Sequence, residues 1–309
     1  MSSEENENKL IISNTGGLIR RMDHQLELMN RVLGEIAERK TELTTRDSFI
    51  GMRAGEERDW EIAPGLNMTF CWCPPGNFLM GSPETEEGRC PTNSLIIEAL
   101  IENQETVEGS WDDESQVTVT LTKGFWMAKM QVTQAQWKAV MGSNPSYFSG
   151  DNLPVETVSW NDAQEFLEKL NALIGNCDGG KMVLPTEAQW EYACRAGETG
   201  PYSGGTIDEV AWYGDNSEYK THPVGMKKSN AWGLHDMHGN VKEWCNDGFD
   251  YELLGGVDPQ GDTSGTDRVC RGGCWLTNAI YCRAANRVVN PLWHTASYYG
   301  FRVARSSVP

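Results

Sequence analysis

Turn-forming residues and tryptophans follow one another closely in the stretch Asn230-Ala-Trp-Gly-Leu-His-Asp-Met-His-Gly-Asn-Val-Lys-Glu-Trp244. Around it, from residue 197 to residue 269, Gly, Asn, Asp and Pro recur every few positions and no long helical pattern appears. The whole chain of 309 residues holds 32 glycines and 12 tryptophans. This composition predicts turns and irregular loops held together by aromatic packing, and it argues against a helix bundle.

Regular elements are predicted upstream of that stretch. Runs with the composition of strands are Met68–Cys73, Val117–Leu121 and Phe125–Met130. Three helices are expected, each beginning at a hydroxyl side chain that can cap it: Thr133–Met141, Ser159–Leu170 and Thr186–Arg195. In the third helix, Gln189 stands where a capping box requires an amide or carboxyl side chain.

Eight segments in this order resemble the formylglycine-generating enzyme (sulfatase-modifying factor) family. They are Phe78–Ser82, Val132–Trp137, Leu153–Ala163, Leu184–Arg195, Pro223–Gly225, Asn230–Trp244, Arg268–Trp275 and Gly300–Arg302. Together they cover about residues 66–305. The resemblance implies an α+β domain with the C-type-lectin-like fold of this family, rich in irregular loops.

A heptad-like seam precedes this domain. Its apolar residues recur every three or four positions between residues 18 and 43, at Ile19, Met22, Leu26, Met29, Leu33 and Ile36. The spacing predicts a helix that either packs on its own domain or drives self-association. We expect an N-terminal helical segment at 1–45, a linker at 46–65 and the family domain at 66–309.

Acidic residues dominate the charge of the chain, which carries 44 Asp and Glu against 26 Lys and Arg, for a net charge of −18. Nucleic acid and anionic membranes repel such a chain, so both are excluded as main partners. Half of this net charge lies between Glu84 and Glu114, where ten acidic residues accompany one arginine. We expect a solvated surface loop there, with residues 91–111 as an insertion.

The cysteines and the N-terminal residues bear on the compartment. None of the nine cysteines shows the Cys-x-x-Cys spacing of zinc or redox sites. Residues 1–17 lack the apolar core of a secretory signal, and no run of about 18 apolar residues predicts a membrane span. These features favour a cytoplasmic protein with free, buried thiols, while a phage particle or non-standard export remains an alternative.

The family resemblance implies a structural calcium ion at the turn that begins at Asp236. The implied ligands are the side chains of Asp236 and Glu243 and the carbonyls of Gly239 and Val241. A hard cation prefers such oxygens, and glycine lets the chain bend around it. The alternative is a metal-free turn in which Glu243 accepts hydrogen bonds from backbone N–H groups.

The resemblance also implies a copper site, which this sequence does not complete. The enzyme of the family oxidises a substrate cysteine with two copper-binding cysteines separated by four residues. Here the second position is Cys282, but the first is Thr277. A hydroxyl is a poor ligand for Cu(I), which prefers thiolates. Copper, and oxidation of a sulfatase cysteine, therefore belong to an alternative function.

The segment 276–299 contains no Lys, Glu, Gln, Met or Asp, in a chain otherwise rich in acids. It resembles the variable region of proteins diversified by retroelements, in which adenines of asparagine codons are changed. Those changes reach Leu, Thr, Asn, Ile, Tyr, Val, His, Ser and Ala, but they cannot give Trp293. Residues of the reachable set, predicted as ligand contacts, are Leu276, Thr277, Asn278, Ile280, Tyr281, Val288, Val289, Asn290, Leu292, His294, Thr295, Ser297, Tyr298 and Tyr299.

We therefore expect a non-catalytic ligand-binding protein that displays residues 276–299 as a variable surface, with Trp275 and Trp293 as packed anchors. Tyr supplies rigid contact area, while Ser, Thr and Asn supply adaptable hydrogen bonds. A shallow display surface suits a protein or another macromolecule better than a small molecule.

Overall fold

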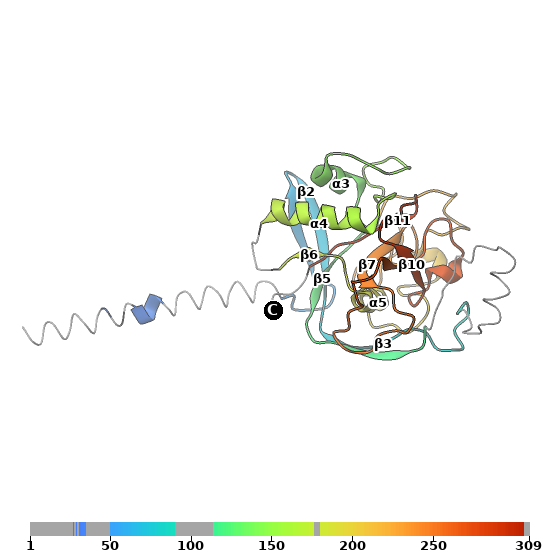
Figure 1. Ribbon diagram of the computed structural model, residues 1–309, viewed down its shortest axis with the longest axis horizontal. Helices are drawn as coiled ribbons and strands as arrows, with labels where there is room; N and C mark the ends of the chain where they lie inside the picture. Colours follow the sequence, from blue (N-terminus) through green and yellow to red (C-terminus); the bar gives the residue numbers. More distant parts are fainter. Residues whose placement is uncertain are drawn as a thin grey trace, which may run out of the picture. The chain divides into compact units, whose positions relative to one another are not determined.

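The computed structural model describes residues 27, 29, 31–34, 50–89, 114–175 and 180–305 (Figure 1). Two units divide the chain, Met1–Phe49 and Ile50–Pro309. In the first unit, the described residues are helical, and Met29 and Leu33 of the predicted seam are exposed. The remaining seam residues, Ile19, Met22, Leu26 and Ile36, lie outside the described residues, so the self-association remains a prediction.

A five-stranded sheet forms one side of the second unit, in the order β1-β2-β5-β12-β6. Its strands are β1 (Glu57–Ala63), β2 (Leu66–Cys73), β5 (Phe125–Ala128), β12 (Ala304–Arg305) and β6 (Met182–Val183). All neighbouring pairs are antiparallel. The last strand of the chain, β12, thus lies inside a sheet that the first strands open, between β5 and β6.

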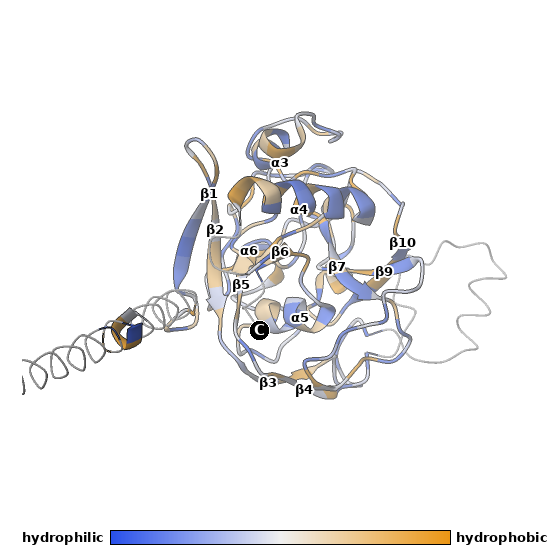
Figure 2. Cartoon of the chain, turned by 60° about the vertical axis from the view of Figure 1, so that its left-hand side comes forward, coloured by the Kyte–Doolittle hydropathy of each residue, from blue (hydrophilic) through white to orange (hydrophobic). Residues whose placement is uncertain are grey.

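Strand β1 corrects the predicted domain boundary, because it lies inside the stretch 46–65 that was expected as a linker. Trp60 packs edge-on against Phe70 of β2 and Trp126 of β5, with ring centroids 4.9 and 5.5 Å apart. Charged residues alternate with this tryptophan, so β1 reads as hydrophilic in Figure 2. Such charges suit an edge strand, which must not attract a further strand.

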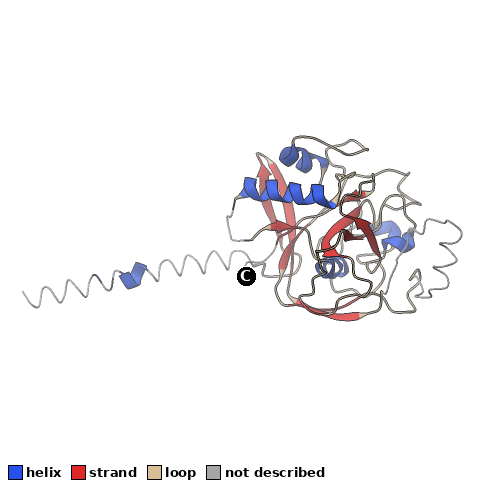
Figure 3. Ribbon diagram, viewed as in Figure 1, coloured by secondary structure: helices blue, strands red, loops and turns tan. Residues whose placement is uncertain are grey.

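Two smaller sheets complete the strand structure. The first has the order β10-β9-β7-β11 and contains β7 (Lys242–Gly248), β9 (Asp267–Arg271), β10 (Arg287–Pro291) and β11 (Tyr299–Gly300). The second has the order β3-β4-β8 and contains β3 (Gly76–Met80), β4 (Val117–Leu121) and β8 (Gly256–Val257). Loops make up much of the remaining chain (Figure 3), which confirms the predicted α+β architecture rich in irregular structure.

Capping boxes begin the three longer helices at the predicted hydroxyl residues, Thr133, Ser159 and Thr186. The helices are α3 (Gln134–Met141), α4 (Trp160–Ile174) and α5 (Glu187–Arg195), followed by the short α6 (Ile207–Val210) and a 3₁₀ turn at Ala279–Cys282. Trp137 of α3 stacks on Phe166 of α4 at 5.3 Å, which joins the two helices.

Helix α5 lies at the junction of the two smaller sheets, where it contacts β3, β7 and β9. Every residue of α5 except Gln189 is buried, and Trp190 and Tyr192 belong to the main hydrophobic core with Met127 and Met237. The buried residues of α5 include Glu187, Glu191 and Arg195. Charged groups at this depth require partners, because an unpaired buried charge is costly.

Candidate ligand-binding surface

Both ends of the 276–299 segment are fixed beside one residue, Glu243 of β7. Strand β9, which precedes the segment, pairs with β7 so that Arg271 lies opposite Glu243. Strand β11, which ends the segment, runs parallel to β7, and Gly300 pairs with the same Glu243. Strands β10 and β11 are the two edges of this sheet (Figure 1), so the segment passes from one edge to the other.

Buried arginines hold the segment to helix α5. The guanidinium of Arg271 pairs with Glu191, and it donates to the carbonyls of Ala285 and Asn286 at 2.7 and 2.8 Å. Arg287 forms two hydrogen bonds with Glu187, at 2.5 and 2.9 Å. Although burial pushes the pKa of Glu187 upward, the positive charges of Arg287 and Arg271 hold that pKa below its usual value.

Arg283 attaches the segment to the acidic stretch of the sequence. Its guanidinium contacts Glu86 at 2.8 Å and both carboxylate oxygens of Glu114 at 2.7 and 2.9 Å. Glu114 is buried and also accepts a hydrogen bond from Ser82 at 2.6 Å. The prediction of a solvated loop over 84–114 is therefore wrong at Glu114, because this carboxylate neutralises a buried arginine. Residues 90–113 lie outside the described residues.

The predicted contact residues fall into three classes of exposure. Exposed positions are Leu276, Asn278, Ile280 and Thr295. Half-buried positions are Tyr281, Val288, Val289, Asn290, Leu292, His294, Ser297 and Tyr298. Two positions, Thr277 and Tyr299, are buried. The exposed and half-buried residues come from the 3₁₀ turn, from edge strand β10 and from the turn before β11.

Tyr299 belongs to the core rather than to the surface, which corrects its predicted role as a ligand contact. Its ring stacks on Trp244 at 5.3 Å, and its hydroxyl accepts a hydrogen bond from Asn290 at 2.8 Å. Thr277 is buried as well, and its hydroxyl accepts from the backbone N–H of Cys274 at 3.0 Å. Neither side chain reaches a partner on the surface without a change of conformation.

Only one of the two expected tryptophan anchors is packed. Trp275 is 8% exposed, donates to the carbonyl of Ser297 at 2.9 Å and meets the ring of Phe148 edge-on at 5.4 Å. Trp293 is 61% exposed, so its prediction as a packed anchor is wrong. Trp293 lies in the turn that follows β10, where the N–H of His294 donates to the carbonyl of Pro291 at 2.8 Å.

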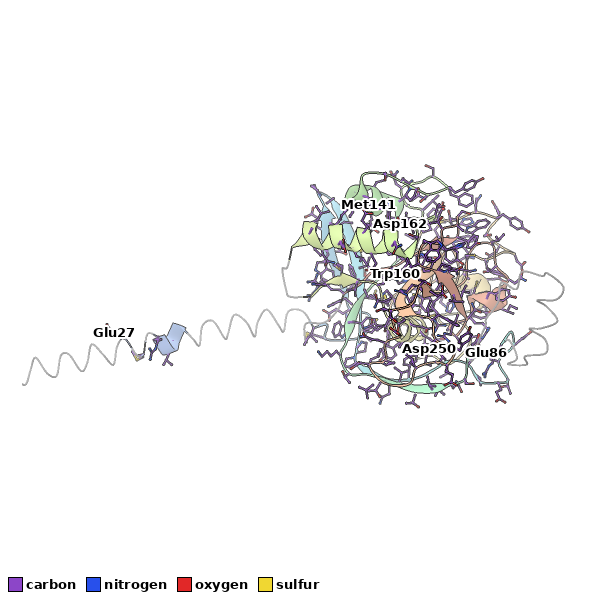
Figure 4. The ribbon with its side chains drawn as sticks, viewed as in Figure 1. Glu27, Glu86, Met141, Trp160, Asp162 and Asp250 are labelled. Atoms are coloured by element: carbon purple, nitrogen blue, oxygen red, sulfur yellow. The ribbon has the colours of Figure 1, made fainter. Side chains whose placement is uncertain are left out.

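The loop after α3 adds an aromatic residue that sequence reasoning missed. Tyr147 is 77% exposed and packs edge-on against Phe148, which in turn contacts Trp275. The start of α4, labelled by Trp160 and Asp162 in Figure 4, adjoins the other part of the segment, where the N–H of Asn161 donates to the carbonyl of Leu292 at 3.2 Å. The only sequence signal for Tyr147 was a tyrosine within a turn-rich loop.

Cys282 is enclosed and has no second thiol at the predicted position. Its Sγ lies 3.7 Å from Oγ1 of Thr277, and a Cβ atom added at Gly273 would lie 2.5 Å from it. Burial raises the pKa of the Cys282 thiol to about 12. The family's copper site of two thiolates does not fit here, because a hydroxyl stands in the place of the first cysteine.

At the turn 236–243, for which the family resemblance implies a calcium ion, oxygen atoms surround the side-chain amide of Gln131. The Nε2 atom of Gln131 lies 2.9 Å from Oε1 of Glu243 and 3.0 to 3.2 Å from the carbonyl oxygens of Val241, Gly239 and Asp236. Asp236 contributes its main-chain oxygen instead of the expected carboxylate, whose Oδ2 accepts from the N–H of Gly225 at 2.7 Å. Gly239 has φ +106°, and a Cβ there would lie 2.3 Å from the carbonyl of Trp212.

Glu243 is already saturated within this turn. Arg302 donates to both of its carboxylate oxygens at 2.6 and 2.7 Å, and Trp190 donates to Oε2 at 2.7 Å. The partners are thus side chains, and not the backbone N–H groups expected for a metal-free turn. Among the residues that the structure describes, no group of three or more His, Cys, Asp or Glu side chains is arranged to hold a metal ion.

A pocket beside β10 is lined by Met80, Glu187, Asp247, Asp250, Leu254 and Arg287, among others. Burial raises the pKa of Asp247 to about 6, although its carboxylate accepts N–H groups of Gly261 at 2.6 Å and Glu187 at 3.0 Å.

The seven described cysteines are free and buried, as expected. No described helix has the length and apolar character needed to cross a membrane.

Comparison with known proteins assigns most of the chain to one protein family. Residues 62–307 match the family model of the sulfatase-modifying factor enzyme 1-like domain. The chain is 33% identical to the chaperone protein LppX of Paenibacillus barcinonensis over 56% of its own length and 75% of that protein. It is 32% identical to the formylglycine-generating enzyme of Mus musculus over 58% of its own length. It spans only 51% of that enzyme, and 60% of the Streptomyces coelicolor formylglycine-generating enzyme, to which it is 34% identical.

Two solved structures cover most of the chain. One is the Treponema denticola variable protein 1, with a TM-score of 0.66 and 29% identity, over 80% of this chain and 98% of that one. The other is PvdO from Pseudomonas aeruginosa, with a TM-score of 0.66 and 25% identity, over 83% of this chain and 100% of that one.

Proposed function

Because the chain belongs to the family of the sulfatase-modifying factor enzyme 1-like domain, we propose that it is a non-catalytic member that binds a ligand through residues 276–299. The observation that carries this proposal is a division within the segment. Its arginines are buried and paired, while twelve of the fourteen predicted contact residues are exposed or half-buried. A rigid frame that presents variable side chains is what a binding surface requires.

The likeness to a protein named as variable supports the same proposal. The chain shares 29% identity with the Treponema denticola variable protein 1 across 80% of its length. The exposed side chains combine aromatic and apolar contact area with small hydroxyl and amide groups, a mixture suited to varied macromolecular partners. We propose a protein ligand, because none of the twelve exposed and half-buried positions lines the pocket beside β10, and small-molecule sites are usually concave.

Surroundings of Cys282 argue against the alternative of a formylglycine-generating oxidase. The thiol is buried, its pKa is raised to about 12, and its neighbour at the first position is Thr277. A Cu(I) titration compares wild type with Cys282→Ser, and we expect identical binding. Thr277→Cys supplies the first thiol of the family's pair and is the positive control, because it shows whether the titration detects a two-thiolate site. Thiolate-dependent binding by the wild type, with conversion of a sulfatase-type peptide cysteine to an aldehyde, would instead favour the oxidase.

Diversification by a retroelement is tested by sequencing the locus in many isolates. We expect a near-identical downstream repeat and a reverse transcriptase, with substitutions concentrated at adenines of the codons for exposed positions such as Leu276, Asn278 and Ile280. Arg271, Arg283 and Arg287 serve as internal controls and should stay unchanged. Substitutions spread evenly along the domain would contradict diversification while leaving ligand binding to be tested separately.

Binding is tested with a library displayed on yeast, because the natural ligand is not needed for it. Random residues at the twelve exposed and half-buried positions should leave display levels near wild type and yield binders to a chosen protein such as lysozyme. A matched library at Arg271, Arg283, Arg287 and Tyr299 should lose display. Equal loss of display in both libraries would mean that the segment is core structure and would overturn the proposal.

A further inference from the structure

An amide nitrogen occupies the centre of an oxygen cage in this protein. Four oxygens surround Nε2 of Gln131 at 2.9 to 3.2 Å, three of them main-chain carbonyls and one a carboxylate oxygen of Glu243. An amide group has two N–H donors, so at most two of the four oxygens can receive a full hydrogen bond. Four acceptors aimed at one point form the kind of donor set that binds hard cations.

Other atoms at this cage also indicate an imperfect replacement. Oε1 of Gln131 and Oδ1 of Asp236 are buried and have no hydrogen-bond partner. Native buried polar atoms are normally paired, so each orphan needs an explanation. The amide cannot rotate to satisfy its oxygen, because the carbonyl would then face the four cage oxygens and be repelled by them.

The position of the cage explains why it must be filled. Glu243 lies opposite Arg271 of β9 and beside Gly300 of β11, the two flanks of the 276–299 segment. Arg302, two residues further on, pairs with both oxygens of the same carboxylate. Carbonyl oxygens left facing one another at this point would repel and would loosen the anchor of both flanks.

We infer that the side chain of Gln131 stands in for a cation at this cage, so that the turn from Asp236 to Glu243 is held without metal in this chain. Removing this amide by substitution of Gln131 then leaves a set of oxygen atoms that a calcium ion can occupy. This inference rests on the cage geometry alone and does not depend on the ligand-binding function.

Thermal unfolding of the full chain in 5 mM calcium and in chelator tests the inference. Wild type should melt at the same temperature in both. Gln131→Ala should melt lower in chelator and recover about 3 °C or more in calcium, because an ion that binds only the folded state raises its stability. Gln134→Ala is the matched control. It removes another buried amide, which donates to the carbonyls of Phe148 and Pro154, and should show no calcium effect.

A second variant keeps the test decisive if Gln131→Ala does not fold. Gln131→Glu places a second carboxylate against Glu243, so folding should require a cation and should respond to calcium. Terbium luminescence gives a direct readout, since Trp190 lies 2.7 Å from Glu243 and can sensitise a bound terbium ion. Calcium stabilisation of the wild type, or no calcium response in both Gln131 variants, would overturn the inference.

Discussion

Residues 282–287 and residues 288–298 adjoin in the sequence, yet they meet opposite environments. The first stretch is buried throughout, and its two arginines are paired with Glu86, Glu114 and Glu187. The second is exposed or half-buried at every position. The comparison teaches that folding is specified by charged residues on the inside of this segment. The exposed side chains of 288–298 thereby carry less of the structural requirement, which is consistent with the proposed binding role.

The largest effect is expected from breaking a buried arginine. Arg271→Met leaves Glu191 and Glu187 with one partner fewer and should lower the free energy of unfolding by about 3–5 kcal/mol. Urea denaturation measures the loss. Lys129→Met is the matched control, because it breaks a partly exposed pair with Glu57 and should cost less than about 1 kcal/mol. Equal losses in the two variants would mean that a buried arginine pair stabilises this domain no more than a partly exposed pair.

The next largest effect on the free energy of unfolding is expected at one of two neighbouring tyrosines, Tyr298 and Tyr299. Tyr299 is 3% exposed and stacks on Trp244, so Tyr299→Ala should cost about 3 kcal/mol through a cavity in the core. Tyr298→Ala, at a half-buried position, should cost about 1 kcal/mol or less. Chemical denaturation of both variants measures the ratio. A reversed order would show that Tyr298 is the packed residue of the pair.

The pH dependence of stability tests the environment of Asp247, whose carboxylate accepts the N–H of Glu187, the partner of Arg287. The pKa of Asp247 is raised to about 6 by burial, above the 3.8 of an ordinary aspartate, so the folded state holds a proton that the unfolded chain has released. Its contribution to stability is complete below about pH 4 and is lost as the pH rises through about 6. The stability of wild type relative to Asp247→Asn should therefore fall between pH 4 and pH 6.

Urea midpoints at several pH values measure that slope, and Asp250→Asn, at an exposed carboxyl three residues further along the chain, is the control. It should follow the wild-type pH dependence. A wild-type curve parallel to that of Asp247→Asn would mean that the carboxyl titrates normally despite its burial.

The smallest effect is expected at Trp293. Because its side chain is 61% exposed, Trp293→Ala should change the free energy of unfolding by no more than about 0.5 kcal/mol. A loss of several kcal/mol would restore Trp293 as the packed anchor that the sequence suggested.

Local signals in the sequence were sufficient for the three longer helices and for strands β2, β4 and β5. Thr133, Ser159 and Thr186 begin their helices as expected, because capping depends on residues within one turn. Strand β1 was missed because its alternation is short and its charges suggest a linker, while its stability comes from Trp126, distant in the sequence. Long-range packing of that kind leaves no mark in a local window.

The candidate surface was predictable in composition but not in orientation. Codon reach identified the segment, yet it could not separate Tyr298 from Tyr299, whose side chains differ only in where the backbone directs them. The buried pairing of Arg283 with Glu114 joins residues 169 positions apart, and Glu114 lay in a stretch whose acidity predicted solvent exposure. Gln131 carried no signal at all, because its partners are main-chain oxygens, which have no sequence identity.

The meeting of both flanks at Glu243 has a consequence for chain length. A loop whose ends are fixed side by side closes at an entropic cost that grows only with the logarithm of its length, about 0.6 kcal/mol for each doubling. Residues 292–297 are exposed or half-buried, so an insertion there should cost less than an insertion at 282–287, which would displace Arg283 and Arg287 from their carboxylates. A longer loop at 292–297 would leave the buried arginine pairs of 282–287 in place.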